Sequence, residues 1–230
     1  MSTSQPSPES IMKVWDEALK EHETVLYIPM SSGLSGTCAT AMMLAEDYNG
    51  KVMVVDNQRI SVTQKNSVMD ALQLSKEGYD AQQIYDVLME TKLDASIYIM
   101  VDTLKYLRKG GRITPAVAAL GTILRIKPVL QIQGEKLDTF AKARTAKQGI
   151  SIMLKALQDD MEHRFHNDIE GMYLNIAHTQ NEKGAMELKE ELLKIYPGVE
   201  IMVNPLSLSV SCHIGPGALA VTAAKKAIIS

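Results

Sequence analysis

The stretch VLYIPMSSGLSGTCATAMM, residues 25–43, places a short apolar run before a turn of serine and glycine, and a segment with helical character follows. A continuously apolar run is typical of a strand in a parallel sheet that helices cover on both faces. A glycine-rich turn between such a strand and a helix gathers unpaired backbone N–H groups at the positive end of the helix dipole. The stretch therefore predicts an α/β fold with an anion site beyond the carboxyl end of a strand.

The residues of this turn narrow the choice of anion. A nucleotide P-loop needs G-x-x-x-x-G-K-[ST] and a dinucleotide fold needs G-x-G-x-x-G, whereas residues 33–36 read GLSG without a lysine. The turn offers instead the hydroxyls of Ser31, Ser32, Ser35 and Thr37, which suit a carboxylate. The structural alternative is that Ser35 only caps the helix and Gly33 only supplies a tight turn.

Composition excludes several classes of protein. The 230 residues are enough for one large domain or two small ones, and a hydrophobic content of 46% is ample for a core. The net charge of -3 leaves no basic footprint for nucleic acid or for an anionic membrane surface. No apolar run approaches the length of a membrane span, and the N-terminus lacks a signal-peptide pattern. We therefore expect a cytoplasmic protein without stable membrane insertion.

The sulfur-containing residues predict neither a metal nor a cofactor. Cys38 and Cys212 lie far apart and lack the spacing of a zinc site or a redox pair, so we expect reduced, buried thiols. The 14 methionines stand against 2 phenylalanines and 1 tryptophan. Because methionine is flexible and polarizable, they either line an irregular apolar cavity or fill the core, and their number alone does not decide which.

Residues 1–93 alternate predicted helices and strands. Ser7 as N-cap and Pro8 at the first helical position begin a helix. Its predicted apolar face comprises Ile11, Val14, Trp15, Ala18 and Leu19. Strands are expected near 25–29 and 51–55, with helices near 36–47, around Val68, Met69 and Leu72, and after the capping box of Asp80 and Gln83. This order predicts a doubly wound, Rossmann-like α/β/α domain with a parallel sheet.

Residues 94–230 follow a different pattern. A strand is predicted at 96–101, and two further strands flank Gln133-Gly134 as a hairpin. After a helix at about 145–162, strands are expected near 171–177, 199–203, 207–212 and 217–222, with a helix between the first two. Hairpins mixed with helices predict a second domain, of α+β type with a mixed sheet.

Three more segments carry candidate chemistry. RKGGR, residues 108–112, ends a short helix, and its glycines allow left-handed backbone there; it is either a solvated basic cap or a binding segment. Arg144 lies at a strand-to-helix junction, where it binds an anion or a partner's carboxylate, or forms a surface ion pair. His213 is placed at a strand end before a rigid turn; a lone histidine is more often structural than catalytic, yet this loop setting is one that functional residues favour.

Taken together, several motifs resemble those of the DegV family. They are TSQPS (3–7), SSGLSGT (31–37), VDN (55–57), LKYLRKGGRI (104–113), IKPVL (126–130) and HIGPG (213–217). Each motif is weak alone, but they occur in the family's order and spacing over essentially the whole chain. The resemblance implies a two-domain α/β protein that binds one long-chain fatty acid between its domains and has no chemistry of its own.

The resemblance also implies a partner and site residues. The best-understood members are subunits that present the acyl carboxylate to a fatty acid kinase, which makes acyl phosphate for phospholipid synthesis. Thr3 and a serine of the SSGLSG turn match the carboxylate contacts; Ser35 with the Gly36 amide is favoured, and Ser32 is the alternative. His213 falls near the head group, and Arg144 matches a family arginine that affects the productive interaction with the kinase. Some of Met30, Met42, Met43, Met53 and Met100 are then expected to line the acyl tunnel.

The start of the sequence departs from the family pattern. Members usually begin with a strand carrying a TDS-type motif and several dozen further residues before TSQPS, whereas this sequence starts at Met1-Ser2-Thr3. The resemblance thus implies a first domain that lacks its N-terminal segment, and a sheet edge that a homodimer would cover.

Two other functions stay open from the sequence. One is an enzyme acting on a small carboxylate or a phosphorylated ligand, with His213 as acid/base. The other is a regulatory protein whose ligand-sensing surface includes residues 108–112; the net charge of -3 speaks against DNA binding in that role.

Overall fold

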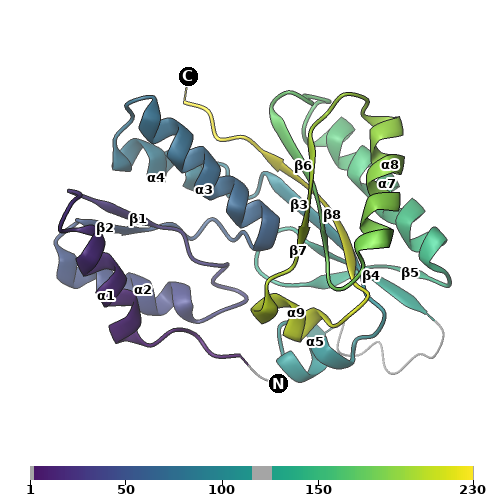
Figure 1. Cartoon of the computed structure of the whole chain (residues 1–230), viewed down its shortest axis with the longest axis horizontal. Coiled ribbons are helices and arrows are strands. Elements are labelled where there is room, and N and C mark those ends of the chain that lie inside the picture. Colours follow the sequence, from purple (N-terminus) through teal and green to yellow (C-terminus); the bar gives the residue numbers. More distant parts are fainter. Residues whose placement is uncertain (1–2, 116–125, 230) are drawn as a thin grey trace.

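The protein is built on two separate sheets (Figure 1). The computed structural model describes residues 3–115 and 126–229. The first sheet pairs β1 (Val25–Tyr27) with β2 (Val52–Val54) in parallel. The second has six strands in the order β5-β4-β3-β8-β6-β7. This confirms the predicted α/β class with a small parallel sheet and a mixed sheet.

Helices cover both faces of the small sheet. On one face, α1 (Pro8–Ala18) and α2 (Thr37–Ala45) pack on alternate strand residues, and the short 3-10 helix η1 (Glu46–Tyr48) follows α2. On the other face lie α3 (Ser61–Lys76) and α4 (Ala81–Glu90). Period-two alternation within β1 sends Leu26 to the α3–α4 side and its neighbours to the α1–α2 side.

The first helix begins as the sequence predicts, but its buried face is narrower. The Ser7 hydroxyl accepts a hydrogen bond from the Ser10 amide, and Pro8 opens the helix. Trp15 is 1% exposed and meets Tyr27 edge-on. The prediction that Val14 belongs to the apolar face was wrong, because it is 66% exposed. It lies on the solvent side of a helix that contacts the core along one narrow stripe.

The large sheet confirms the predicted hairpin and mixed pairing. Its strands are β3 (Ala95–Met100), β4 (Lys127–Ile132), β5 (Asp138–Ala143), β6 (Met172–His178), β7 (Ile201–Pro205) and β8 (Leu219–Lys225). β4 and β5 form the antiparallel hairpin around Gln133-Gly134. All neighbouring strands are antiparallel except β6 and β7, which are parallel.

The two faces of the large sheet have different partners. Helices α7 (Ala146–His163) and α8 (Glu182–Ile195) cover one face, as Figure 1 shows. The other face packs against α3, α5 (Lys105–Gly110) and α9 (Leu208–Ile214). Along β3, Tyr98 and Met100 point to the first face, while Ile97 and Ile99 point to the second. The second face is therefore the one turned toward the small sheet.

One predicted strand is a helix. Residues near 207–212 alternate serine with apolar residues, which suggested a strand, but the chain forms α9 there. Val210 and Ile214, four positions apart, pack on the large sheet, while Leu208 is 74% exposed. Helical spacing therefore buries the apolar residues better than alternation would, and His213 lies in the last turn of a helix instead of at a strand end.

Helix α3 joins the two sheets. The Asn175 amide on β6 donates to Asn66 Oδ1 of α3 at 2.8 Å, and the Tyr173 hydroxyl donates to Asp70 Oδ1 at 2.8 Å. The predicted domain boundary at residues 93 and 94 falls between α4 and β3, and it stays a prediction; α3, which precedes it, packs against β6 and β8, and its Leu74 lies in the same hydrophobic cluster as Leu26 of β1. None of the helices in residues 3–115 and 126–229 is long and apolar enough to cross a bilayer.

Candidate functional site

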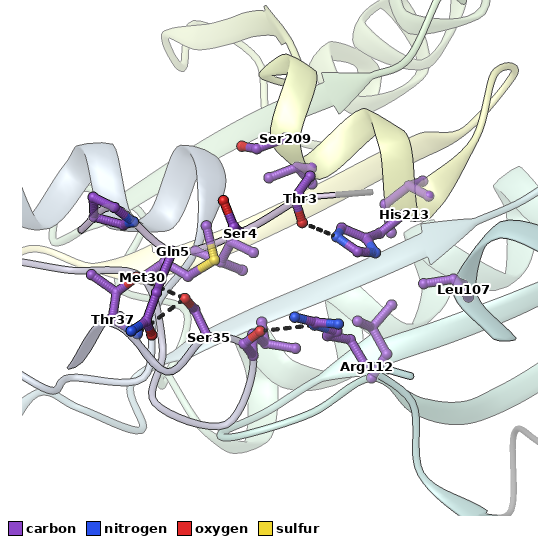
Figure 2. A pocket seen from close by; sticks show the side chains of 16 residues that line it. Thr3, Ser4, Gln5, Met30, Ser35, Thr37, Leu107, Arg112, Ser209 and His213 are labelled. Atoms are coloured by element: carbon purple, nitrogen blue, oxygen red, sulfur yellow. Dashed lines mark hydrogen bonds between the residues drawn. The ribbon is translucent and has the colours of Figure 1, made fainter. Parts of the chain in front are cut away.

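A cavity of about 240 Å³ lies between the small-sheet part and the large-sheet part (Figure 2). Its walls come from the segment before α1, the serine-glycine turn before α2, the end of α5 and helix α9. The polar side chains that line it include Thr3, Gln5, Ser35, Thr37, Arg112, Ser209 and His213. Segments far apart in the sequence thus form one site.

The polar end centres on Thr3 and His213. Thr3 Oγ1 lies 2.6 Å from His213 Nε2, within hydrogen-bond distance. The imidazole packs so closely against Gly110 that a Cβ there would collide with its Nδ1. The glycine at the end of α5 therefore makes room for the ring.

The surroundings of His213 favour its neutral form. Burial lowers the pKa of the imidazole, and the positive charge of Arg112 lowers it further. A neutral ring carries one N–H donor and one acceptor nitrogen, and the Thr3 hydroxyl can complement either. This end of the cavity therefore combines a neutral polar pair with a guanidinium.

Arg112 is a site residue that the sequence interpretation assigned to a basic cap or a regulatory surface. Its Nε donates to the Leu34 carbonyl at 3.3 Å and its guanidinium also donates to the Gly110 carbonyl. Gly111 has φ 68°, which confirms the predicted left-handed backbone at the end of α5. That turn reverses the chain, so that Arg112 points back into the cavity (Figure 2).

Ser35 lines the cavity but does not occupy the predicted capping position. Helix α2 has Gly36 as its N-cap, without a side-chain cap bond. The Ser35 hydroxyl accepts from the Thr37 amide at 3.2 Å and lies 2.9 Å from Thr37 Oγ1. Gly36 and the exposed Ser32 are not among the residues that line this cavity, and the Ser32 amide donates to Asp56 Oδ1 at 3.2 Å.

The serine-glycine turn is held against the β4–β5 hairpin. A Cβ on Gly33 would collide with the backbone of Glu135, and the buried Ser31 hydroxyl donates to the Glu135 carbonyl at 3.4 Å. Position 33 therefore requires glycine, because the backbone of the turn lies directly against Glu135. This contact positions the turn relative to the large sheet.

The opposite end of the site is apolar. A second space of about 40 Å³, the inner chamber, adjoins the cavity. It is lined almost wholly by aliphatic side chains of the large sheet, α9 and the start of α3. The two spaces share four lining residues, Ile60, Leu137, Val210 and Ile214. The combined site passes from hydroxyl, imidazole and guanidinium groups to hydrocarbon.

One of the five candidate tunnel methionines lines the cavity. Met30 lines the cavity, whereas Met100 is buried on the opposite face of the large sheet. Met42 and Met43 are 42% and 60% exposed on α2, and Met53 of β2 lines neither space. The sequence predicts only that some of the five line the tunnel, because a methionine count carries no information about which face each residue occupies.

Other predicted residues lie outside the cavity. Arg144 is exposed between β5 and α7, as predicted, and its backbone amide donates a hydrogen bond to Gln148 Oε1 at 2.8 Å. Cys38 and Cys212 form no disulfide; Cys38 is buried and Cys212 is half-buried, less than expected. Within the described part of the chain, no group of three or more His, Cys, Asp or Glu is placed to hold a metal ion.

Comparisons with known proteins give a consistent result. The family model described as "uncharacterised protein, DegV family" matches residues 1–226. A DegV domain-containing protein of Clostridium perfringens is 32% identical over 96% of this chain and 76% of its own length. Protein DegV of Bacillus subtilis is 31% identical over 96% of this chain and 77% of its own length.

Solved structures of DegV family proteins also match this chain. A structure described as fatty acid binding of a DegV family protein from Thermus thermophilus has a TM-score of 0.89 and 33% identity, covering 97% of this chain and 79% of that one. DegV, a fatty acid binding protein from Bacillus subtilis, has a TM-score of 0.84 and 30% identity, covering 98% and 79%.

The fold and the site define an α/β protein of two sheets that holds, between them, a cavity with one polar and one apolar end. The chain belongs to the DegV family.

Proposed function

We propose that this protein binds one long-chain fatty acid in the cavity, with the carboxylate at the polar end and the acyl chain toward the inner chamber. The observation that carries this proposal is the change from hydroxyl, imidazole and guanidinium groups to aliphatic side chains along one continuous site. Family relatives described as fatty acid binding support the choice of ligand.

The carboxylate contacts in this proposal are Thr3, Ser35 and His213, with Arg112 supplying positive charge. The Thr3 hydroxyl and the imidazole lie 2.6 Å apart, which supports their binding one head group together. Hydrogen bonds to an ionised acceptor are stronger than neutral ones, and they keep a carboxylate ionised when it is partly dehydrated. Ser32 and the Gly36 amide, which lie outside the cavity lining, are secondary candidates.

The acyl chain supplies most of the affinity. Burial of an alkyl chain is worth about 0.8 kcal/mol per CH₂, so roughly fifteen methylenes contribute on the order of 12 kcal/mol before the costs of binding. The aliphatic walls of the inner chamber provide the surface for this burial.

The first experiment is mass spectrometry of the small molecules released when the purified protein is denatured. A stoichiometric fatty acid supports the proposal and identifies the chain. If the released fraction is empty, titration with a fluorescent fatty acid decides the matter, and the absence of saturable binding would refute the proposal.

The proposed function also involves a partner protein. We infer that the protein is a binding protein that presents its ligand to an ATP-dependent fatty acid kinase, which makes acyl phosphate. Arg144 is exposed and outside the cavity, so it is free to contact another protein. Arg144→Ala should then retain fatty-acid affinity and lose acyl-phosphate formation when the kinase is added. Equal rates for the variant and the wild type would exclude this role for Arg144.

A second candidate function rests on the distance of 2.6 Å between Thr3 and His213, which suits an imidazole base beside a hydroxyl. In this case the protein would be an enzyme acting on a small carboxylate or a phosphorylated ligand, with His213 as acid/base. It requires turnover by the purified protein alone, and loss of that turnover in His213→Ala.

The cellular setting is also proposed. The two cysteines form no disulfide, which suits the reducing cytoplasm. Within the described residues β1 and β2 pair only with each other, and a homodimer would cover such unpaired strand edges.

A further inference from the structure

The inner chamber has a floor of unusually small side chains at its centre. Ala177 of β6 and Ala220 of β8 are cross-strand partners, and each is 2% exposed. On the other side of Ala220, the partner in β3 is the much larger Ile99. Methyl side chains at the two central positions leave space that branched residues would fill.

The roof over this floor consists of bulky aliphatic residues. Ile60 and Val62 come from the start of α3, and Val210 and Ile214 come from α9. Ile60, Val210 and Ile214 also line the larger cavity that holds Thr3 and His213. The alanine pair therefore lies in the apolar part of the site, where the far end of an acyl chain would pack.

The floor becomes polar in the next row. Thr222 of β8 pairs with Asn175 of β6, whose amide donates to Asn66 Oδ1 at 2.8 Å. An alkyl chain extended past this row would separate Asn175 from Asn66 without giving either amide a new partner, which is unfavourable. The apolar chamber is thus closed one row beyond the alanines.

We propose that Ala177 and Ala220 set the length of the longest acyl chain that the protein accepts. The inference rests on the proposed function, and it assigns the chain-length selectivity of the same site. Because the chamber is only about 40 Å³, two extra methyl groups at position 220 would occupy the space of the last carbons of the chain. Valine suits this position because β-branched residues are favoured in strands.

The expected effect depends on chain length. Each methylene that no longer finds room loses about fourfold in affinity. Ala220→Val should therefore leave the affinity for a twelve-carbon fatty acid unchanged. It should weaken the affinity for the longest accepted chain by about tenfold or more. Ala177→Val, on the partner strand, should produce the same pattern.

The test measures the affinity of saturated fatty acids of twelve, fourteen, sixteen and eighteen carbons for the full chain. Wild type, Ala220→Val, Ala177→Val and Ala141→Val are compared. Ala141 is half-buried on β5 and lines neither space, so it provides the same chemical change elsewhere in the large sheet.

A shift of the optimum toward shorter chains in both floor variants, with Ala141→Val unchanged, confirms the inference. Parallel affinity profiles for wild type and a folded Ala220→Val or Ala177→Val overturn it, while the proposed function survives. If the wild type binds none of the four fatty acids, the proposed function fails and the inference fails with it.

Discussion

Thr3 Oγ1 and His213 Nε2 are 210 positions apart in the sequence and 2.6 Å apart in space. Both residues line the cavity, and their contact joins the segment before α1 to the last turn of α9. It also links the small-sheet part of the protein to the large-sheet part at the proposed head-group position.

Thr3→Val should weaken fatty-acid binding by about 1–3 kcal/mol, because an ionised head group would lose a hydrogen bond in a partly dry site. Titration with a fluorescent fatty acid measures the change. Ser4→Ala is the control, since it changes a neighbouring hydroxyl that also lines the cavity but is not assigned to the carboxylate. Equal affinities for Thr3→Val and wild type would remove Thr3 from the head-group site.

Stability should depend on pH through His213. Burial and Arg112 lower the pKa of this histidine in the folded protein. Above the ordinary pKa near 6.5 the ring is neutral in both states, and as the pH falls the unfolded chain takes up the proton first. The free energy of unfolding should therefore decrease as the pH falls below about 6.5.

Denaturant unfolding of the ligand-free protein at several pH values tests this. His213→Gln keeps polar atoms near Thr3 and should show a weaker decrease between neutral and mildly acidic pH. A pH profile parallel to that of the wild type would show that His213 does not contribute.

Tyr173→Phe should destabilise the protein by about 1–3 kcal/mol, because it leaves a buried carboxylate oxygen of Asp70 without its hydroxyl partner. Unfolding in urea measures the loss. Tyr48→Phe removes a comparable bond to Asp16 at an exposed site, and it should cost less. A similar loss in both variants would argue against a special role for the contact between α3 and β6.

Two residues on α1 should differ sharply in their contribution to stability. Ile11 is 4% exposed and Val14 is 66% exposed. Ile11→Ala should cost about 2–5 kcal/mol, and Val14→Ala should change stability by less than about 0.5 kcal/mol. Thermal unfolding of both variants measures the difference; a large loss for Val14→Ala would mean that another surface covers this side of the helix.

Thr222→Val should stabilise the protein by about 1 kcal/mol. Among the described residues the buried Thr222 hydroxyl has no hydrogen-bond partner, and valine has the same shape without the polar group. Urea unfolding measures the gain. A loss of stability would indicate that the hydroxyl is hydrogen-bonded in solution, for example to a buried water molecule.

Local features of the sequence determined the class of the fold and pointed to one wall of the candidate cavity. Ser7 and Pro8 begin α1, Asp80 and Gln83 cap α4, and the alternation of apolar runs with helices indicates an α/β protein. These features are readable because capping and periodicity depend on residues a few positions apart. The serine-glycine turn was identified for the same reason, and Ser35 does line the cavity.

Tertiary structure alone decided what meets across the cavity. The orientation of Arg112 toward the turn before α2 depends on how the two sheets pack, and local sequence carries no record of that packing. The helix at residues 208–214 forms because Val210 and Ile214 find the large sheet beneath them, while the alternating pattern of their segment favoured a strand. Periodicity states which residues share a face; only long-range packing determines what that face contacts, and a binding site between two sheets consists of such contacts.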